Sequence, residues 1–338
     1  MRQIPERTRD LRLDAAKGIL IILVVLGHLL EATAGWNARS TRLPLTAIYM
    51  FHMPAFVFLA GVTAKPTQLP KRIGTFLVML ALFQSLYFIE VHLIGLNKTF
   101  SLLIPFWILW FLLAMCWWQL IMPLIRKFPR TSIAVSLLTA IFSGTFESIG
   151  YDLTLSRTLV FLPFFVIGAT YGQVILRMAY QLPRVAKLVG VIVAGVAWTY
   201  LYAQNIRPGW LYGSFSFERL KVEDGAGILI RIGLMIIAML VVLTFLSLTP
   251  KSSTVLVALG RRSLAIFALH GFIVLAVTPL MPIVLQKSGN VIAVGICLLL
   301  TVFTVASFSL PVFDRTIRRI SQATISLISK PFVSRNAS

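Results

Sequence analysis

The stretch KGILIILVVLGHLLE, residues 17–31, decides the fold, because its few polar side chains fall on one line of an otherwise apolar helix. At 100° per residue, the eleven-residue step from Lys17 to His28 returns to nearly the same direction around the helix axis. Asp14 and Glu31 lie only about 40° from that line. A histidine placed roughly 16 Å beyond a lysine in hydrocarbon is costly unless protein surrounds it. We therefore expect this helix to cross a membrane and to carry functional groups.

The composition is that of a membrane-embedded chain. Of the 338 residues, 58% are hydrophobic and 12% are charged, whereas soluble domains have about twice that charge. We predict one integral-membrane domain over residues 1–338, with no separate soluble domain. Cys116 and Cys297 each stand alone in an apolar run, so the sequence predicts no disulfide framework, no metal site and no permanently bound cofactor.

Ten apolar runs are each long enough to cross a bilayer core of about 30 Å as a helix. They predict an all-α membrane protein, a polytopic bundle of about ten transmembrane helices. The fifth run is the weakest, because the segment Phe142-Ser-Gly-Thr loosens its end and a re-entrant segment is an alternative. The ten runs are 15–33, 44–63, 73–95, 104–124, 131–147, 157–176, 185–203, 226–248, 261–280 and 290–312.

The charge distribution predicts the orientation of these spans. The net charge of +20 does not indicate nucleic-acid binding, because the basic residues bracket apolar runs instead of clustering on one polar face. Of the 31 Lys and Arg residues, 22 fall in alternate loops on one side together with both termini. Because cytoplasmic loops collect basic residues, we predict cytoplasmic tails at 1–14 and 313–338.

A cleavable signal peptide is an alternative for the first run, because the small-residue triplet Ala32-Thr33-Ala34 follows it. Cleavage there would remove His28. The long leading segment contains three acids and the triplet follows directly after Glu31, which favours a retained first span.

Depth groups the ionisable residues within the spans. Adjacent antiparallel spans place His28 and His52 at similar depth in the outer half, His270 falls near the middle of the ninth span, and Glu90 approaches the outer end of the third. For any single histidine, the alternative is a packed ring bonded to backbone. Pro54 removes a backbone donor, so we expect a kink beside His52.

Several arginines are candidates for binding substrate or donor. Arg157 and Arg231 can bind anionic or hydroxyl-rich substrate groups, although snorkelling to the interface is the ordinary alternative. Arg261 and Arg262, together with Arg72, can bind phosphates of a cytoplasmic donor, although the positive-inside rule also explains them.

The loop 204–225 carries Trp210, Tyr212, Phe215 and Phe217 among charged residues. Such aromatic faces pack well on pyranose rings. An interfacial aromatic belt is the alternative explanation.

Five segments resemble one family, the integral-membrane acyltransferase 3 family of bacterial surface-glycan O-acyltransferases. They occur in the family's order, and the branch they look most like is that of fucose 4-O-acetylases. The segments are the basic residue with ten intervening residues and a histidine (Lys17 to His28), FHMPAFVFLAGV at 51–62, WILWFLLAMC at 107–116, RTLVFLPFFVIG at 157–168 and LGRRSLAIFALHG at 259–271.

The resemblance implies an enzyme of the bacterial inner membrane that takes an acyl group, usually acetyl from acetyl-CoA, to a sugar hydroxyl on the far side. It implies that His28 is catalytic and that Lys17 is its partner in the signature. Two departures stand out. The second segment ends in Ala60-Gly61 instead of Ser-Gly, and no soluble hydrolase-like domain is attached.

The residue chemistry agrees with this implication. O-acylation needs a base to remove the proton of a sugar hydroxyl, and a neutral imidazole does so near pH 7. We predict His28 as general base or transient acyl carrier, with Glu31 one turn away to orient the ring. The predicted substrate-binding residues are Asp14, Lys17, His52, Glu90, Arg157, Arg231 and His270.

The expected partners are acyl-CoA as co-substrate, a glycan or lipid-linked sugar acceptor and the lipid bilayer, with a homo-oligomer or a glycan-assembly complex as further options. An ion- or proton-coupled transporter or exporter of a glycan precursor is the main alternative, because membrane histidines and acids also serve as relays. A scaffold subunit without chemistry is a third option.

Overall fold

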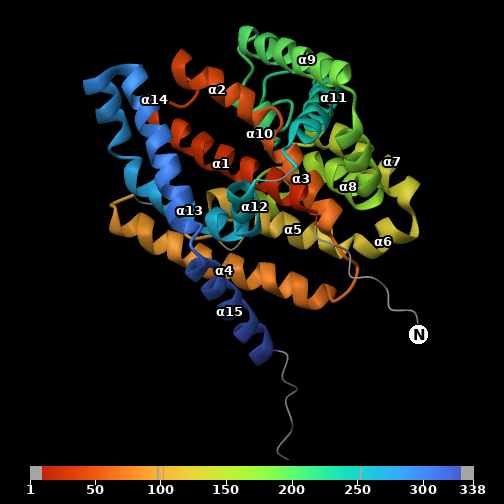
Figure 1. Ribbon diagram of the computed structural model, residues 1–338, viewed down its shortest axis with the longest axis horizontal. Helices are drawn as coiled ribbons and strands as arrows, with labels where there is room; N and C mark the ends of the chain where they lie inside the picture. Colours follow the sequence, from red (N-terminus) through yellow and green to blue (C-terminus); the bar gives the residue numbers. More distant parts are fainter. Residues whose placement is uncertain (1–9, 97–98, 102, 252, 329–338) are drawn as a thin grey trace, which may run out of the picture.

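The computed structural model describes residues 10–96, 99–101, 103–251 and 253–328, and these are helical with no strand (Figure 1). The predicted tail residues 1–9 and 329–338 lie outside the described part. The α-helices are α1 (Leu11–Thr33), α2 (Arg39–Tyr49), α3 (His52–Thr63), α4 (Leu69–Leu93), α5 (Trp110–Leu120), α6 (Met122–Lys127), α7 (Pro129–Phe142), α8 (Leu155–Gln181), α9 (Arg184–Ala203), α10 (Pro208–Tyr212), α11 (Asp224–Leu248), α12 (Thr254–Arg261), α13 (Ser263–Val277), α14 (Met281–Phe308) and α15 (Pro311–Ile328).

The number of membrane spans is lower than the sequence predicts. Seven helical segments of the described chain are long and apolar enough to cross a membrane, and α12 with α13 adds an eighth if this pair, bent by 78°, is one span. The fourth predicted span is only a short apolar helix, Trp107–Leu120, and the fifth is the 14-residue α7. Every predicted span is therefore helical, but the count of about ten is not confirmed.

The second predicted span is broken where the sequence indicates a kink. α2 ends at Tyr49 and α3 begins at His52. Pro54 lies in the first turn of α3 and cannot donate a backbone hydrogen bond to the preceding turn. The break sets Tyr49 and His52 side by side, with their ring centroids 4.6 Å apart.

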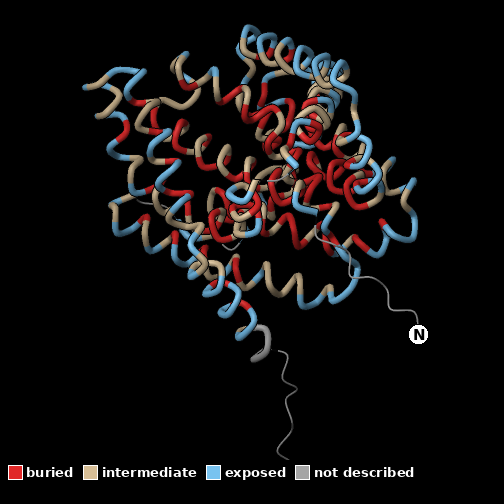
Figure 2. Tube along the Cα trace, in the orientation of Figure 1, coloured by how far each residue is buried: buried red, intermediate tan, exposed pale blue. Residues whose placement is uncertain are grey.

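Helix α1 lies at the centre of the bundle, where buried residues gather (Figures 1 and 2). It packs against α12 especially closely, because a glycine on each helix faces backbone of the other. A Cβ on Gly260 would overlap the carbonyl oxygen of Asp14, and a Cβ on Gly18 would overlap that of Leu256. The backbones of α1 and α12 are therefore in direct contact at Asp14 and Gly18.

Helices α3 and α8 form a second close crossing. A Cβ on Gly61 would overlap the carbonyl oxygen of Phe165, and one on Gly168 would overlap that of Phe58. Gly61 thus allows the close packing of α3 on α8. Ala60, which stands where the family usually has serine, lines a small cavity.

The helices at the periphery leave apolar side chains uncovered. On α9, Val185 and Val196 are 73% and 62% exposed, and on α14, Leu299 is 72% exposed. Such continuous apolar surface is unusual in water but suits the acyl chains of a bilayer.

The C-terminal end differs from the predicted boundary between span and tail. α14 runs from Met281 to Phe308 with a break at Gly289, where φ is +75°. The residues after it form α15, which packs Phe313 and Ile317 with α4 residues of one apolar cluster. The predicted tail at 313–338 therefore begins as an ordered helix.

Candidate active site

The site lies at the C-terminal end of α1. His28 and Glu31 are three residues apart, so a helix places both side chains on one face. His28 Nδ1 lies 3.2 Å from Glu31 Oε2. After Thr33 the helix ends, and Gly35 adopts a left-handed conformation with φ of +53° that turns the chain back. This turn brings Trp36 over the Glu31 carboxylate.

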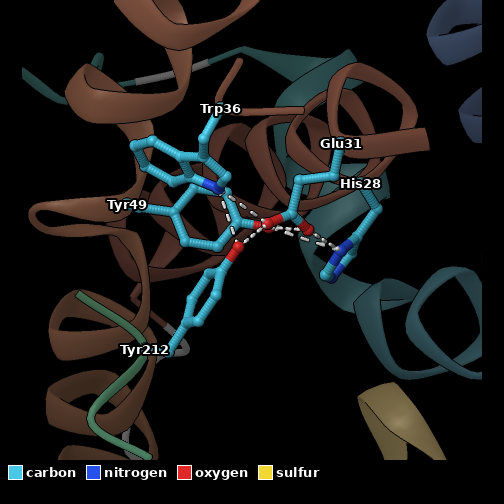
Figure 3. A network of polar contacts seen from close by, with 5 residues as sticks. All are labelled: His28, Glu31, Trp36, Tyr49 and Tyr212. Atoms are coloured by element: carbon cyan, nitrogen blue, oxygen red, sulfur yellow. Dashed lines mark hydrogen bonds and ion pairs between the residues drawn. The ribbon is translucent and has the colours of Figure 1, made fainter. Parts of the chain in front are cut away.

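The Glu31 carboxylate is the centre of a polar network (Figure 3). The Tyr49 hydroxyl donates to Oε2 at 2.6 Å. The Tyr212 hydroxyl donates to Oε1, and Trp36 Nε1 donates to Oε1 at 3.3 Å and to the Tyr212 oxygen at 2.7 Å. Hydroxyl and indole donors thus reach both oxygens of one carboxylate.

This network determines which nitrogen of His28 is free. Because Glu31 accepts hydrogen bonds from Tyr49, Tyr212 and Trp36, it acts as an acceptor, and an ionised carboxylate has no proton to give. In the neutral ring of His28, Nδ1 therefore carries the proton that it donates to Glu31, and Nε2 has the lone pair. The side chain of His28 is 15% exposed, so Nε2 is available to a ligand.

Tyr212 is a member of the site that the sequence indicated only as part of an aromatic loop. It ends the five-residue helix α10, and Gly213 with φ of +63° follows it. Burial raises the pKa of Tyr212 above its usual range, and the adjacent Glu31 charge and hydrogen bond raise it further. The hydroxyl therefore stays protonated and keeps donating.

Aromatic rings enclose the other faces of His28. Trp107 contacts it edge-on at a centroid distance of 4.6 Å, and His270 stacks on it at 5.5 Å with an angle of 22° between the rings. Trp107 adopts a φ of +37°, an unfavourable conformation for a residue with a side chain. Such strain is maintained by surrounding structure and concentrates at functional sites.

A cavity of about 500 Å³ opens in front of His28. Its size fits a sugar residue together with part of a second ligand. It brings together four of the predicted site residues, which come from α1, α3 and α8. They are His28, Glu31, His52 and Arg157.

His52 and His270 differ in their relation to this cavity. His52 lines it, and its Nδ1 lies 2.9 Å from the Ile48 carbonyl oxygen. His270 is fully buried behind His28, its Nδ1 lies 2.8 Å from the Phe267 carbonyl oxygen, and its Nε2 has no partner. His270 is thus bonded to backbone of its own helix and His52 to backbone at the end of α2, as the alternative for a single histidine expected.

Arg231 and Glu90 lie outside the main cavity. Arg231 is 4% exposed and donates to the Ala140 carbonyl, the Ser143 hydroxyl and the Phe215 carbonyl. It therefore ties α11 to the end of α7 and to the loop after α10. Glu90 is half-buried on α4, with one oxygen unpartnered.

The remaining polar residues of α1 lie at its opposite end, at the crossing with α12. Asp14 is buried and its Oδ2 lies 3.3 Å from Arg261 Nε. Arg262 donates to the Ser309 carbonyl at 2.7 Å. Lys17 is half-buried on the same helix. The structure does not bring Lys17 or Asp14 to the cavity of His28.

Arg72 lines a separate cavity of about 200 Å³. The same cavity contains Gln119, which is buried and has an unpartnered Oε1. Arg261 and Arg262 are not among its lining residues, so the three donor-phosphate candidates do not form one site.

The sequence also missed Tyr49, Trp36 and Trp107. Tyr49 lies three residues before His52 beside the predicted kink, which is the only local signal for it. Trp107 belongs to the segment 107–116 that carried part of the family resemblance. Trp36 and Tyr212 meet across 176 residues of chain, and no spacing rule predicts such a contact.

The fold and the site define a class, that of multi-pass helical membrane proteins with a half-buried histidine–carboxylate pair that lines a cavity. The chain belongs to the acyltransferase 3 family, whose sequence model, described as an acyltransferase domain, matches residues 10–310. It is thus a member of a family of membrane acyltransferases.

Two curated relatives match a shorter part of the chain. The nodulation protein NolL of Sinorhizobium fredii (strain NBRC 101917 / NGR234) is 51% identical over 63 residues, which is 18% of this chain and 17% of the relative. The nodulation protein NolL of Mesorhizobium japonicum (strain LMG 29417 / CECT 9101 / MAFF 303099) is 45% identical over 65 residues, or 19% and 17%. No solved structure matches the chain.

Proposed function

We propose that this protein is an O-acyltransferase of the bacterial inner membrane that moves an acyl group, most simply acetyl from acetyl-CoA, to a hydroxyl of a cell-surface or exported glycan. The observation that carries the proposal is the free Nε2 of His28 in a cavity, with Nδ1 held by Glu31. A histidine oriented by a carboxylate is the usual arrangement for general-base catalysis.

The transfer follows from this geometry. Nε2 of His28 takes the proton of the acceptor hydroxyl as its oxygen attacks the thioester carbonyl carbon. The tetrahedral intermediate collapses by breaking the C–S bond, and the leaving thiolate takes the proton from His28. Glu31 stabilises the imidazolium that forms between these steps. The same orientation also supports attack of Nε2 on the thioester, with a transient acyl group on His28.

The cavity around Arg72 supports a binding site for the donor. The guanidinium of Arg72 suits the phosphates of CoA. The cavity is lined by α3, α4 and α5, and these helices also line part of the main cavity. On α4, Phe76 lines the smaller cavity and Gln84 the larger one. These two residues are about 12 Å apart along the helix, a distance that an extended pantetheine arm spans.

The polar line of α1 from Lys17 to His28 is not the route that we propose for the acyl group, because α12 packs against the Lys17 end of α1. We propose instead that the donor reaches His28 along the seam of α3, α4 and α5. The candidates Arg261 and Arg262 then stabilise helix packing, since Arg261 pairs with Asp14 and Arg262 with the Ser309 carbonyl.

The decisive experiment replaces His28 by Ala and by Asn in the full chain. We expect loss of ester-linked acyl groups from the surface glycan, measured by mass spectrometry, because neither side chain can take a proton. The matched control is His92→Ala, since His92 is exposed and bonds only the Phe88 carbonyl. Normal membrane abundance must be confirmed for each variant, and full acylation by His28→Ala at that abundance would refute the proposal.

A further inference from the structure

The main cavity contains a cation that the protein does not neutralise. Among the described residues that line it, only Glu31 and Arg157 are fully charged types. No carboxylate of the described chain lies within 4.0 Å of Arg157, and its Nε is buried without a partner. Arg157 is half-buried, and a charge held partly out of water without a counter-charge is costly, so its retention needs a reason.

The surroundings hold this guanidinium without bonding it fully. Arg157 lies over the rings of Trp110 and Tyr151, with its central carbon 5.2 Å and 5.3 Å from their centroids. The preceding residues Leu153 and Thr154 both have positive φ, at 49° and 57°, so a strained turn sets the start of α8. Stacking fixes the plane of a guanidinium and leaves its edge for a planar anion.

The buried Arg231 shows the contrast. Arg231 directs its terminal nitrogens to three protein oxygens, those of Ala140, Ser143 and Phe215, and needs no ligand. Arg157 interacts with the Tyr151 side chain, but the described part of the chain gives it no such set of oxygen acceptors.

Glu31 does not supply the missing negative charge to Arg157. Its oxygens are occupied by Tyr49, Tyr212, Trp36 and His28. No described carboxylate thus pairs with Arg157, and an anionic ligand in the cavity would supply its counter-charge.

We infer that Arg157 binds an oxyanion on the acceptor, so that the substrate of the proposed acyl transfer is an acidic glycan. The inference rests on the proposed function in taking the acceptor to be a glycan. A uronate carboxylate and a phosphate ester both offer the paired oxygens that a guanidinium edge recognises. Arg157 then selects the acceptor and orients its hydroxyl toward His28.

Binding to the full chain in non-ionic detergent tests this inference without turnover. Trp107 and Trp110 line the cavity, so their fluorescence reports occupancy. The probes are trigalacturonate as the acidic sugar, maltotriose as the neutral sugar, maltose 1-phosphate as the phosphorylated sugar, and coenzyme A without an acyl group. We expect the wild-type protein to bind trigalacturonate about tenfold more tightly than maltotriose, as one charge-assisted bidentate contact allows. The phosphate probe shows whether phosphate substitutes for carboxylate.

Variants assign the preference to the residue. Arg157→Gln should bind acidic and neutral sugars with affinities within about twofold of each other. Arg157→Lys should keep part of the preference for acidic sugars, because its ammonium is charged but cannot form the bidentate contact of a guanidinium. Arg219→Gln is the control, since Arg219 is exposed and outside the cavity. If Arg157→Gln does not fold, the inference is still tested by the wild-type affinities for trigalacturonate and maltotriose. Added salt should weaken the binding of trigalacturonate but not that of maltotriose.

Three results would overturn the inference. The first is equal affinity of the wild-type protein for acidic and neutral probes. The second is a preference for acidic sugars that survives in Arg157→Gln. The third is that Arg157→Gln loses affinity for coenzyme A alone and not for the acidic sugar. Equal affinity combined with loss of turnover in Arg157→Gln would mean that the cation serves the reaction intermediate instead. His28→Ala should keep the sugar preference, so failure of the catalytic proposal and failure of this one are distinguishable.

Discussion

At the scale of single residues, the hydrogen-bond donors around Glu31 indicate whether this acid shuttles protons or orients His28. An acid that shuttles protons needs a state in which its own proton has an acceptor. The neighbours of Glu31 are the hydroxyls of Tyr49 and Tyr212 and the indole of Trp36, all of which donate to it. These contacts support the proposed roles, in which Glu31 orients His28 and stabilises its charged form while His28 moves the proton.

Replacing Tyr212 by Phe should lower kcat while leaving the protein folded. The change removes a hydrogen bond to a charged group, worth about 1.5–3 kcal/mol, and about tenfold to a hundredfold in rate if the bond holds Glu31 in the transition state. Steady-state kinetics of the purified protein measure the effect. Tyr200→Phe is the control, since Tyr200 is 59% exposed. Wild-type kcat in Tyr212→Phe would remove Tyr212 from the site.

The raised pKa of Tyr212 makes a second prediction. A phenol whose pKa is raised by burial and by Glu31 stays protonated at pH values where free tyrosine, with its pKa of 10.0, ionises. The ratio of wild-type to Tyr212→Phe rates should therefore stay constant from neutral pH up to about 10. A pH–rate profile of both proteins measures this ratio. Convergence of the two rates as the pH approaches 10 would show that Tyr212 has lost its proton and contradict the prediction.

At the scale of helices, the crossing of α1 and α12 sets where the end of α1 lies. Replacing Gly260 by Ala forces the two helices apart, because a Cβ there meets the Asp14 carbonyl. Overpacking of this kind costs about 1–3 kcal/mol, so the midpoint of thermal unfolding in detergent should fall. The control Gly195→Ala, on α9, meets nothing within 4 Å and should keep the midpoint or raise it. Equal midpoints for the two variants would show that the crossing adapts.

The positions of the helices were predictable from the sequence where the length of an apolar run determines them. The ten runs, the kink at His52 and the pair His28 and Glu31 all follow from periodicity and local spacing. The bend between α12 and α13 was not predictable, because it depends on how α12 packs into α1. Tyr212 reaches Glu31 across 181 residues, and only the packed bundle brings the two together.

At the scale of the whole molecule, the number of membrane crossings depends on one helical hairpin. Seven spans and the bent pair α12–α13 account for eight crossings. The segment from Trp107 to Phe142, made of α5, α6 and α7, either adds two crossings or re-enters from one side. α5 and α6 together are about as long as a span but are broken at Ile121, and α7 is about 21 Å long. The turn of this hairpin is at Lys127 and Phe128.

Cysteine labelling from outside intact cells distinguishes the two arrangements. Lys127 and Arg219 are exposed, while the native Cys116 and Cys297 are buried and give little background. If the hairpin crosses, α7, α8 and α9 separate the two positions, so an impermeant maleimide should label Arg219→Cys and should label Lys127→Cys only after the membrane is permeabilised. Both termini then lie in the cytoplasm, as the excess of basic residues on that side predicts. Labelling of both positions in intact cells would show that the hairpin re-enters the membrane from outside. The proposal that the cavity at Arg72 binds the donor requires the first outcome, because Gln119 of α5 must then lie toward the cytoplasm, where acyl-CoA is made.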